Sequence, residues 1–358
     1  MGLGSWSSIV GNVLLFFLVL GLAVTVEFDE FKRSLRSKGL FIGVFAQFVF
    51  LPLCSFVIAR TLLQDKPVLG IPLIVTASSP GGSYSNWWTS LFNGDLSLSV
   101  AMTTVSSILS IGFLPLNLFI YIEGAYPNGT AIKMKWGGLF VAISLVIVGI
   151  VLGIFLGGWV PKVKKVLNIG GNICGALLVL LGFFFSSNSS SPIWSRGWKF
   201  YVGLTVPCVM GLVISLGFAR LARLEMPQAL AVAIEVCYQN TAIALAVILS
   251  SFEDDPSCRT RGQATCDIVG EATGVPTFYQ LVQVVSLGIL CLIAWHRGWS
   301  YAPKGTSLYA AITKDFQPHH GDTIEVIQEN GAPERDMEQI GEANLWRIGE
   351  AKNYDWYL

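Results

Sequence analysis

One acidic side chain lies deep inside an apolar run that is long enough to cross a lipid bilayer. Glu235 sits in the stretch Ala229-Leu-Ala-Val-Ala-Ile-Glu235-Val-Cys-Tyr-Gln239, and no Lys or Arg lies at a matching depth in the other apolar runs. An unpaired carboxylate at the bilayer centre costs about 2.5 kcal/mol or more. A proton or a metal cation is therefore expected to offset this charge. The alternative is a buried, protonated Glu235 that is hydrogen-bonded to Gln239.

A second polar feature interrupts another apolar run. Pro80-Gly81-Gly82 falls in the middle of the stretch 68–92. Proline removes a helical hydrogen bond, and glycine weakens the helix around it. Unwound backbone at membrane depth is tolerated only where it is buried in protein or lines a watery cavity. The sequence therefore predicts a break in this helix, surrounded by Ser79, Ser83, Ser85 and Asn86. A plain kink in a packed helix is the alternative.

Two further groups of polar residues lie within apolar runs. Spacings of three and four residues place one group on a single helix face, namely Ser99, Thr103, Ser106 and Ser110. Gln47 lies in the middle of the run 39–62. Small hydroxyl and amide side chains also pack membrane helices against each other without any ligand, and this interpretation stays open for both groups.

Together these residues supply oxygen atoms from hydroxyls, amides and one carboxylate, beside backbone carbonyls at the break. Oxygen ligands suit hard cations, whereas metals that bind thiols or imidazoles need Cys and His. All three histidines lie at or beyond the last apolar run. The runs 68–92 and 226–251 are both expected to be interrupted, and they have opposite directions, which is typical of inverted-repeat transporters. Their half-helix N-termini could face an anion.

The elements that must position these residues are predicted to be membrane-spanning helices. Of the 358 residues, 53% are hydrophobic and only 13% are charged, and the mean hydropathy is +0.61. Soluble domains carry about 25% charged residues. Segments that span lipid must satisfy their own backbone hydrogen bonds, so they are helical. We expect an all-α polytopic membrane protein with about nine transmembrane helices, at 8–28, 39–62, 68–92, 96–122, 137–160, 165–186, 198–220, 226–251 and 275–297.

Basic residues near the ends of these runs indicate the orientation. They follow the first, fifth and seventh runs, which places those connections and the C-terminus in the cytosol and the N-terminus outside. The glycosylation sequons at Asn128 and Asn188 then fall outside, as does a possible disulfide between Cys258 and Cys266. No retention signal is evident, so the plasma membrane is the default location for this multi-pass protein.

The motifs around the break resemble the bile acid:sodium symporter family. The matching stretches are Pro80-Gly-Gly-Ser-Tyr-Ser-Asn86, Gly94-Asp-Leu-Ser-Leu-Ser99-Val-Ala-Met-Thr103-Thr104 and Glu235-x-x-x-Gln239-Asn240, and the resemblance covers about residues 10–300. It implies a panel domain and a core domain, with two discontinuous helices that cross in the core. Many family members have Gly at the position of Cys237, where this chain departs from the pattern.

The resemblance also implies two sodium sites and a substrate site. One sodium site would use five residues, Ser85, Asn86, Ser99, Thr103 and Glu235. The other would use Gln47, Glu235 and Gln239 together with nearby backbone carbonyls. Ser83 and Asn240 match positions that can face the substrate.

We therefore expect a secondary active transporter that imports an organic anion, such as a bile-acid-like molecule, a steroid sulfate or a small carboxylate, with two Na⁺ ions. Its partners would be this anion, sodium and the lipid bilayer, with no cofactor and no nucleic acid. One alternative is a proton-coupled or sodium-independent carrier that uses Glu235, and another is a non-transporting membrane receptor or scaffold. An enzyme is not expected, because no nucleophile–base pair or catalytic metal cluster is visible. Residues 1–300 would form the transmembrane transporter domain and residues 301–358 an acidic, disordered cytosolic tail.

Overall fold

The fold was examined in a computed structural model, which describes residues 3–24, 37–82, 84–127, 136–160, 163–189, 191–252, 267–314 and 316–317. Throughout this part of the chain the regular elements are helices, so the expected all-α membrane fold is confirmed. Seven of the described helices are long and apolar enough to cross a membrane. They are α1 (Leu3–Ala23), the continuous segment of α3 (Lys38–Phe45), η1 (Ala46–Phe50) and α4 (Leu51–Thr61), α7 (Leu96–Ala125), α8 (Trp136–Trp159), α9 (Lys164–Ser187), α10 (Trp198–Leu221) and α14 (Ile268–Arg297).

Two further apolar runs are each divided into a pair of short helices. The run expected at 68–92 forms α5 (Pro67–Ser78) and α6 (Tyr84–Leu91), and the run at 226–251 forms α11 (Met226–Cys237) and α12 (Thr241–Ser251). Both predicted interruptions are therefore present as helix breaks. The number of spans in a bilayer stays a prediction.

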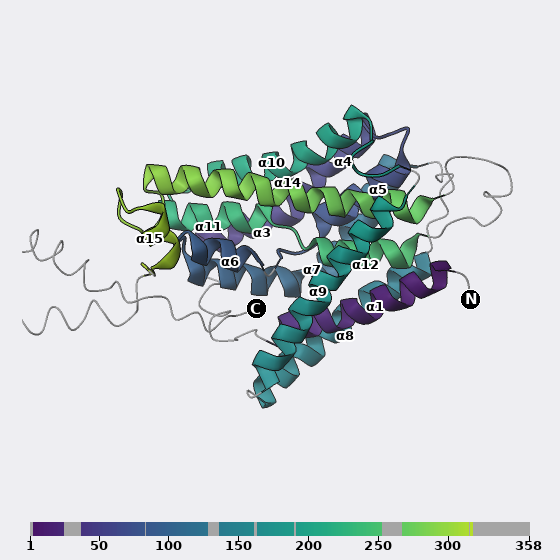
Figure 1. Ribbon diagram of the computed structural model, residues 1–358, viewed down its shortest axis with the longest axis horizontal. Coiled ribbons are helices and arrows are strands. Elements are labelled where there is room, and N and C mark those ends of the chain that lie inside the picture. The colour runs from purple at the N-terminus through teal and green to yellow at the C-terminus, as the bar shows by residue number, and fades with distance from the viewer. Residues whose placement is uncertain are drawn as a thin grey trace, which may run out of the picture.

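The helices pack in two groups (Figure 1). In the smaller group α1 lies against both α8 and α9, and the backbones of α1 and α9 meet where Gly21 faces Gly171. Glycines allow this close approach, which is common between membrane helices. The larger group contains α3 to α7, α10, α11 and α14, while α12 and α14 contact helices of both groups. The expected division into a panel domain and a core domain stays a prediction.

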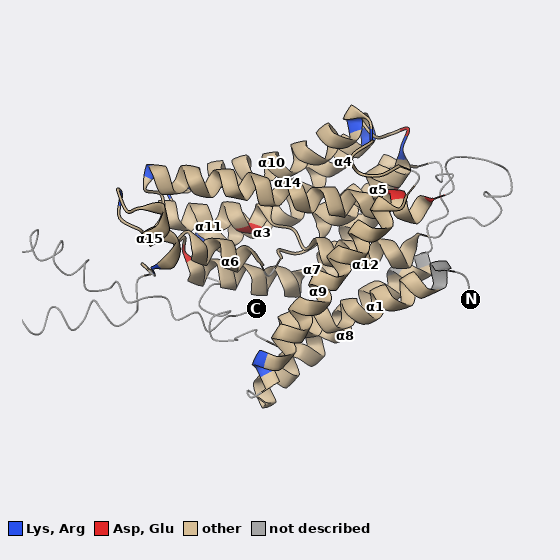
Figure 2. Ribbon diagram, in the orientation of Figure 1, with Lys and Arg blue, Asp and Glu red and all other residues tan. Residues whose placement is uncertain are grey.

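Charged residues of the described chain gather near the helix ends, and the middle of the bundle is almost free of them (Figure 2). Near one end, Arg196 ties the connection between α9 and α10 to α14, because its guanidinium donates hydrogen bonds to the carbonyls of Ser191 and Glu271, both at 2.9 Å. The same guanidinium lies 4.6 Å from the ring centroid of Phe200. Burial lowers the pKa of Arg196 to about 10, which leaves it charged at neutral pH.

The beginning of the expected disordered tail is folded against the bundle. Residues Leu308–Thr313 form α15, which contacts α6. The buried Asn93 anchors this segment: its Nδ2 donates to the carbonyl of Ala311 at 2.7 Å, and its Oδ1 accepts from the amide of Phe316 at 3.0 Å. The expectation of disorder from residue 301 is therefore wrong for this part, because one buried amide satisfies two of its backbone groups. The rest of the tail lies outside the described residues.

Several expected sites also lie outside the described residues, namely Ser83, Asn128, Cys258 and Cys266. Asn188 is described and exposed, and its Nδ2 donates to the carbonyl of Phe184 at 2.9 Å. Glycosylation at Asn188 and Asn128, the disulfide and the orientation in the membrane stay predictions.

Replacing Asn93 by Ala is expected to destabilise the protein by about 2–4 kcal/mol. The residue has a φ of 54°, a left-handed conformation that costs about 1–2 kcal/mol for an ordinary residue. Its two hydrogen bonds to the C-terminal segment contribute about 1 kcal/mol each. Asn93→Gly is the control, because glycine adopts this φ freely and isolates the hydrogen-bond part. Thermal unfolding of the purified protein in detergent would measure both, and an Ala variant with the wild-type Tm would contradict the proposed anchoring.

Candidate functional site

The two helix breaks cross each other and satisfy each other's backbone. The amide of Gly82 donates to the carbonyl of Tyr238, and the amide of Asn240 donates to the carbonyl of Pro80, both at 2.9 Å. Between these bonds Gly81 and Gln239 form an isolated antiparallel bridge. Broken helices leave backbone groups without helical partners, which is costly at membrane depth. The crossing therefore stabilises both breaks, although about 150 residues of sequence separate them.

Local sequence explains why each helix stops and restarts at the crossing. Pro80 lacks an amide hydrogen and cannot continue α5, which ends at Ser78 with Ser79 in an extended conformation. On the other side Asn240 caps the N-terminus of α12, because its Oδ1 accepts from the amide of Ile243 at 3.1 Å. A Cβ atom at Gly81 would overlap the carboxylate of Glu235. Glycine at this position therefore lets the break approach the buried acid.

The first cluster surrounds the carboxylate of Glu235, of which only 1% is exposed. Hydroxyl groups donate to its two oxygens: Ser85 to Oε2 at 2.6 Å, Thr103 to Oε1 at 2.8 Å and Ser99 to Oε2 at 3.3 Å. The Oδ1 of Asn86 is an alternative acceptor for two of these hydroxyls, at 2.8 Å from Ser99 Oγ and 3.2 Å from Thr103 Oγ1, because each hydroxyl has one proton and can donate either to Asn86 or to Glu235. The structure thus brings together all five residues expected at one sodium site, from α6, α7 and α11.

The electrostatics of this cluster leave the acid without a basic partner. Within the described chain, each hydrogen bond to Glu235 comes from a hydroxyl, and no Lys or Arg forms an ion pair with it. Hydroxyl donors stabilise a carboxylate but do not neutralise its charge. Each hydroxyl also keeps lone pairs that can face a cation when its proton points away. The arrangement can therefore hold a small hard cation or a proton.

The second cluster joins η1 to the break between α11 and α12. Gln47 and Gln239 exchange hydrogen bonds, with Gln47 Nε2 donating at 2.6 Å and Gln239 Nε2 donating at 3.1 Å. Gln47 also donates to the carbonyl of Ser79 at 2.8 Å, and Gln239 to that of Val236 at 2.8 Å. Gln47 lies in the π-helical turn η1, an arrangement often found at functional sites.

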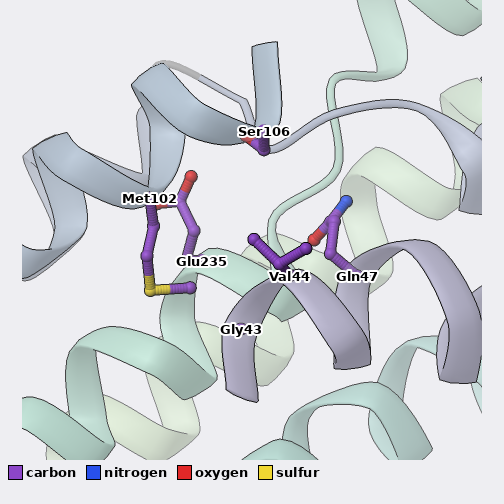
Figure 3. A pocket seen from close by; sticks show the side chains of 6 residues that line it. All are labelled: Gly43, Val44, Gln47, Met102, Ser106 and Glu235. Atoms are coloured by element: carbon purple, nitrogen blue, oxygen red, sulfur yellow. The ribbon is translucent and has the colours of Figure 1, made fainter. Parts of the chain in front are cut away.

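A small cavity connects the two clusters (Figure 3). It has a volume of about 10 Å³, and Gln47 and Glu235 line it from different elements together with Gly43, Val44, Met102 and Ser106. This is close to the smallest space that holds one water molecule. Of the three residues expected at the other sodium site, Gln47 and Glu235 therefore face one cavity, and Gln239 bonds to Gln47 beside it. Sodium binding at either cluster stays a prediction.

A second cavity lies beside the crossing, between the two helix groups. Its volume is about 40 Å³, and it is lined by Leu18 of α1 and Gly175 of α9 on one side and by Gly82, Tyr238 and Asn240 of the breaks on the other. The described residues that line it include no Lys, Arg or His. Asn240, which was expected to face the substrate, therefore lines this cavity, while its Oδ1 accepts the capping hydrogen bond from α12.

Sequence reasoning missed the glutamines of α14. Gln280 and Gln283 both bond to residues of the second break or its neighbours. Their spacing of three residues in an otherwise apolar run was a usable signal, of the same kind as the hydroxyl stripe on α7. Thr89 was also missed; its Oγ1 donates to Ser99 Oγ at 3.2 Å behind the first cluster.

An all-helical membrane protein with two crossing broken helices around a buried acid is a known class of transporter architecture. The family model described as Sodium Bile acid symporter family matches residues 12–191, half of the chain, and the chain belongs to this family. The chain is 34% identical over 167 residues to the hepatic sodium/bile acid cotransporter of Homo sapiens, covering 46% of this chain and 48% of that protein. It is 28% identical over 250 residues to the ileal sodium/bile acid cotransporter of Oryctolagus cuniculus, covering 69% and 71%. It is also 31% identical over 251 residues to the P3 protein of Bos taurus, of which it covers 49%.

Gly81→Ala is expected to destabilise the protein by about 1–3 kcal/mol, because the added methyl group must displace the carboxylate of Glu235 or the opposing break. Gly112→Ala on α7 is the matched control, since a Cβ atom there meets nothing within 4 Å. The measurement is thermal unfolding of both variants in the same detergent. Equal Tm values for the two variants would show that the close approach at Gly81 is not required.

Proposed function

We propose that this protein is a secondary active transporter that imports an organic anion together with sodium. The observation that carries the proposal is the buried carboxylate of Glu235, which meets two broken helices and an oxygen-rich cluster without a basic partner. Membership of the sodium bile acid symporter family supports the same function. The relatives named as sodium/bile acid cotransporters make an organic anion the expected substrate class.

The first cluster is the proposed site of one sodium ion. It offers the carboxylate of Glu235, the amide oxygen of Asn86 and the hydroxyls of Ser85, Ser99 and Thr103, which already lie within hydrogen-bond distance of one another. A cation here would replace hydroxyl protons as the partner of the carboxylate. Since the ion neutralises a buried charge, its binding stabilises the whole crossing.

The second cluster is the proposed site of another sodium ion. Its amide oxygens from Gln47 and Gln239 and the nearby carbonyls of Ser79 and Val236 are neutral ligands, and Glu235 supplies the negative charge from the shared cavity. With two Na⁺ and one monovalent anion, each cycle would carry one net positive charge inward. A membrane potential then adds about 2.3 kcal/mol per 100 mV to the driving force.

The organic anion is proposed to bind at the cavity between the two helix groups, beside the crossing. Its uncharged lining offers Asn240 and other polar groups but no cation, so the two sodium ions would balance the anion's charge. Movement of α1, α8 and α9 against the larger group would open this cavity to either side in turn. The cytosolic C-terminus, the plasma membrane location and residues 1–300 as the transport domain complete the proposal.

Glu235→Gln is expected to abolish sodium-dependent uptake, because a neutral amide leaves the cation without a counter-charge. The assay is uptake of radiolabelled bile salts, steroid sulfates and small carboxylates into vesicles, with a sodium gradient or with choline in its place at fixed pH. Glu123→Gln is the control, since Glu123 is exposed on α7. Uptake that survives choline but follows a proton gradient would favour a proton-coupled carrier, and sodium-dependent uptake that persists in Glu235→Gln would refute the assignment of this residue.

Gln47→Leu is expected to lower the Hill coefficient for sodium from above 1 to about 1, because it removes a ligand of the second cluster and leaves the first intact. Ser110→Ala is the control: this buried hydroxyl of α7 donates only to the carbonyl of Ser107 in its own helix. Initial uptake rates over a range of sodium concentrations give the coefficient. An unchanged coefficient in Gln47→Leu would count against a second ion at this place.

A further inference from the structure

The break between α11 and α12 has two edges, and the crossing uses only one of them. In an extended segment, successive residues direct their backbone groups to opposite sides. The carbonyl of Tyr238 and the amide of Asn240 face the other break and pair with Gly82 and Pro80. The amide and carbonyl of Gln239 therefore face away from it, toward α14.

One side chain of α14 bonds to both groups on this second edge, and the carbonyl also accepts from the amide of Thr241 at 2.9 Å. The Oε1 of Gln283 accepts from the amide of Gln239 at 3.1 Å, and its Nε2 donates to the carbonyl of Gln239 at 3.2 Å. A side-chain amide has one carbonyl acceptor and an N–H donor, as a peptide group does. Gln283 can therefore pair with the backbone of Gln239 as a neighbouring β-strand would. Its side chain is fully buried.

A second glutamine of α14, Gln280, forms further hydrogen bonds with the break. Gln283 Nε2 donates to Gln280 Oε1 at 2.8 Å, and Gln280 Oε1 also accepts from Thr241 Oγ1 at 2.6 Å. Gln280 Nε2 in turn donates to the hydroxyl of Tyr238 at 2.7 Å. Tyr238 and Thr241 are thus bonded to α14 as well.

The consequence reaches the second cluster through the side chain of Gln239. Its backbone is held between Gln283 on one side and the crossing on the other, and its side chain meets Gln47 at 2.6 Å. We propose that Gln283 is a positioning residue for the second sodium site: it fixes the backbone of Gln239, and with it the side-chain amide that pairs with Gln47. This inference rests on the proposed function.

The test uses Gln283→Leu, which removes both hydrogen bonds at similar volume, and Gln283→Glu, which keeps an acceptor for the amide of Gln239 but loses the donor. Thr277→Val is the matched control, because this buried hydroxyl of α14 donates only within its own helix, to the carbonyl of Thr273. The first readout is the rise in Tm of the purified full-length protein as NaCl replaces choline chloride at constant ionic strength. The second is vesicle uptake, giving the half-saturating sodium concentration and the KM for the anion at saturating sodium.

Gln283→Leu is expected to raise the half-saturating sodium concentration about tenfold, because the loss of buried hydrogen bonds costs free energy that corresponds to about this change in affinity. The KM for the anion is expected to stay within about twofold. Gln283→Glu is expected to raise the half-saturating sodium concentration as well. If the Leu variant does not reach the membrane, the Glu variant provides the test. Thr277→Val is expected to match the wild type in both readouts.

Unchanged sodium dependence in both Gln283 variants, with only a lower Tm or a lower maximal rate, would overturn the proposal, because a merely structural residue would act in that way. Failure of the proposed function is a different result. In that case the wild type itself would show neither stabilisation by sodium nor sodium-dependent uptake.

Discussion

The contact between the carboxylate of Glu235 and the hydroxyls around it is the constraint on which the core depends. A buried carboxylate without a basic partner is among the most costly groups that a membrane protein can hold. Three hydroxyls from α6 and α7 converge on it, and they can do so only because α6 begins at the crossing. The broken helix, the glycines of the break and the hydroxyls of α7 therefore all serve to stabilise the buried charge of Glu235.

The crossing also explains how the chain tolerates unwound backbone at this depth. Each break supplies hydrogen-bond partners for the other, and α14 supplies them for the outer edge of the second break. The two breaks differ in composition. The first, residues 79–82, contains a proline and two glycines, whereas the second, residues 238–240, contains neither. The second break is consequently maintained by its partners, including the cap of Asn240 on α12, and not by its own backbone preferences.

The features of the fold and the site that could be predicted from the sequence are those that depend on a short stretch of residues. Helix positions, the break at Pro80 and the importance of Glu235 follow from hydropathy, proline and one buried charge, and each can be recognised within a short stretch. The roles of Gln283 and of Asn93 could not be predicted in this way. They depend on which distant segments become neighbours: Gln283 is 44 positions from its partner, and Asn93 holds Ala311 from 218 positions away. The same reason applies to the ordered start of the acidic tail.

The different chemistry of the two clusters bears on how two cations could share one acid in the proposed mechanism. A unit charge about 4 Å from the carboxylate interacts with it by about 4 kcal/mol at an effective dielectric constant of 20. The first ion therefore removes most of the field that a second ion would feel. The second cluster would therefore act on an ion mainly through dipoles, because the paired side-chain amides of Gln47 and Gln239 carry no net charge. Dipoles stabilise an ion only when they are fixed in advance, because turning them costs free energy. A second ion would thus depend on how firmly the break holds these dipoles as much as on the charge of Glu235, whereas a first ion would depend mainly on that charge.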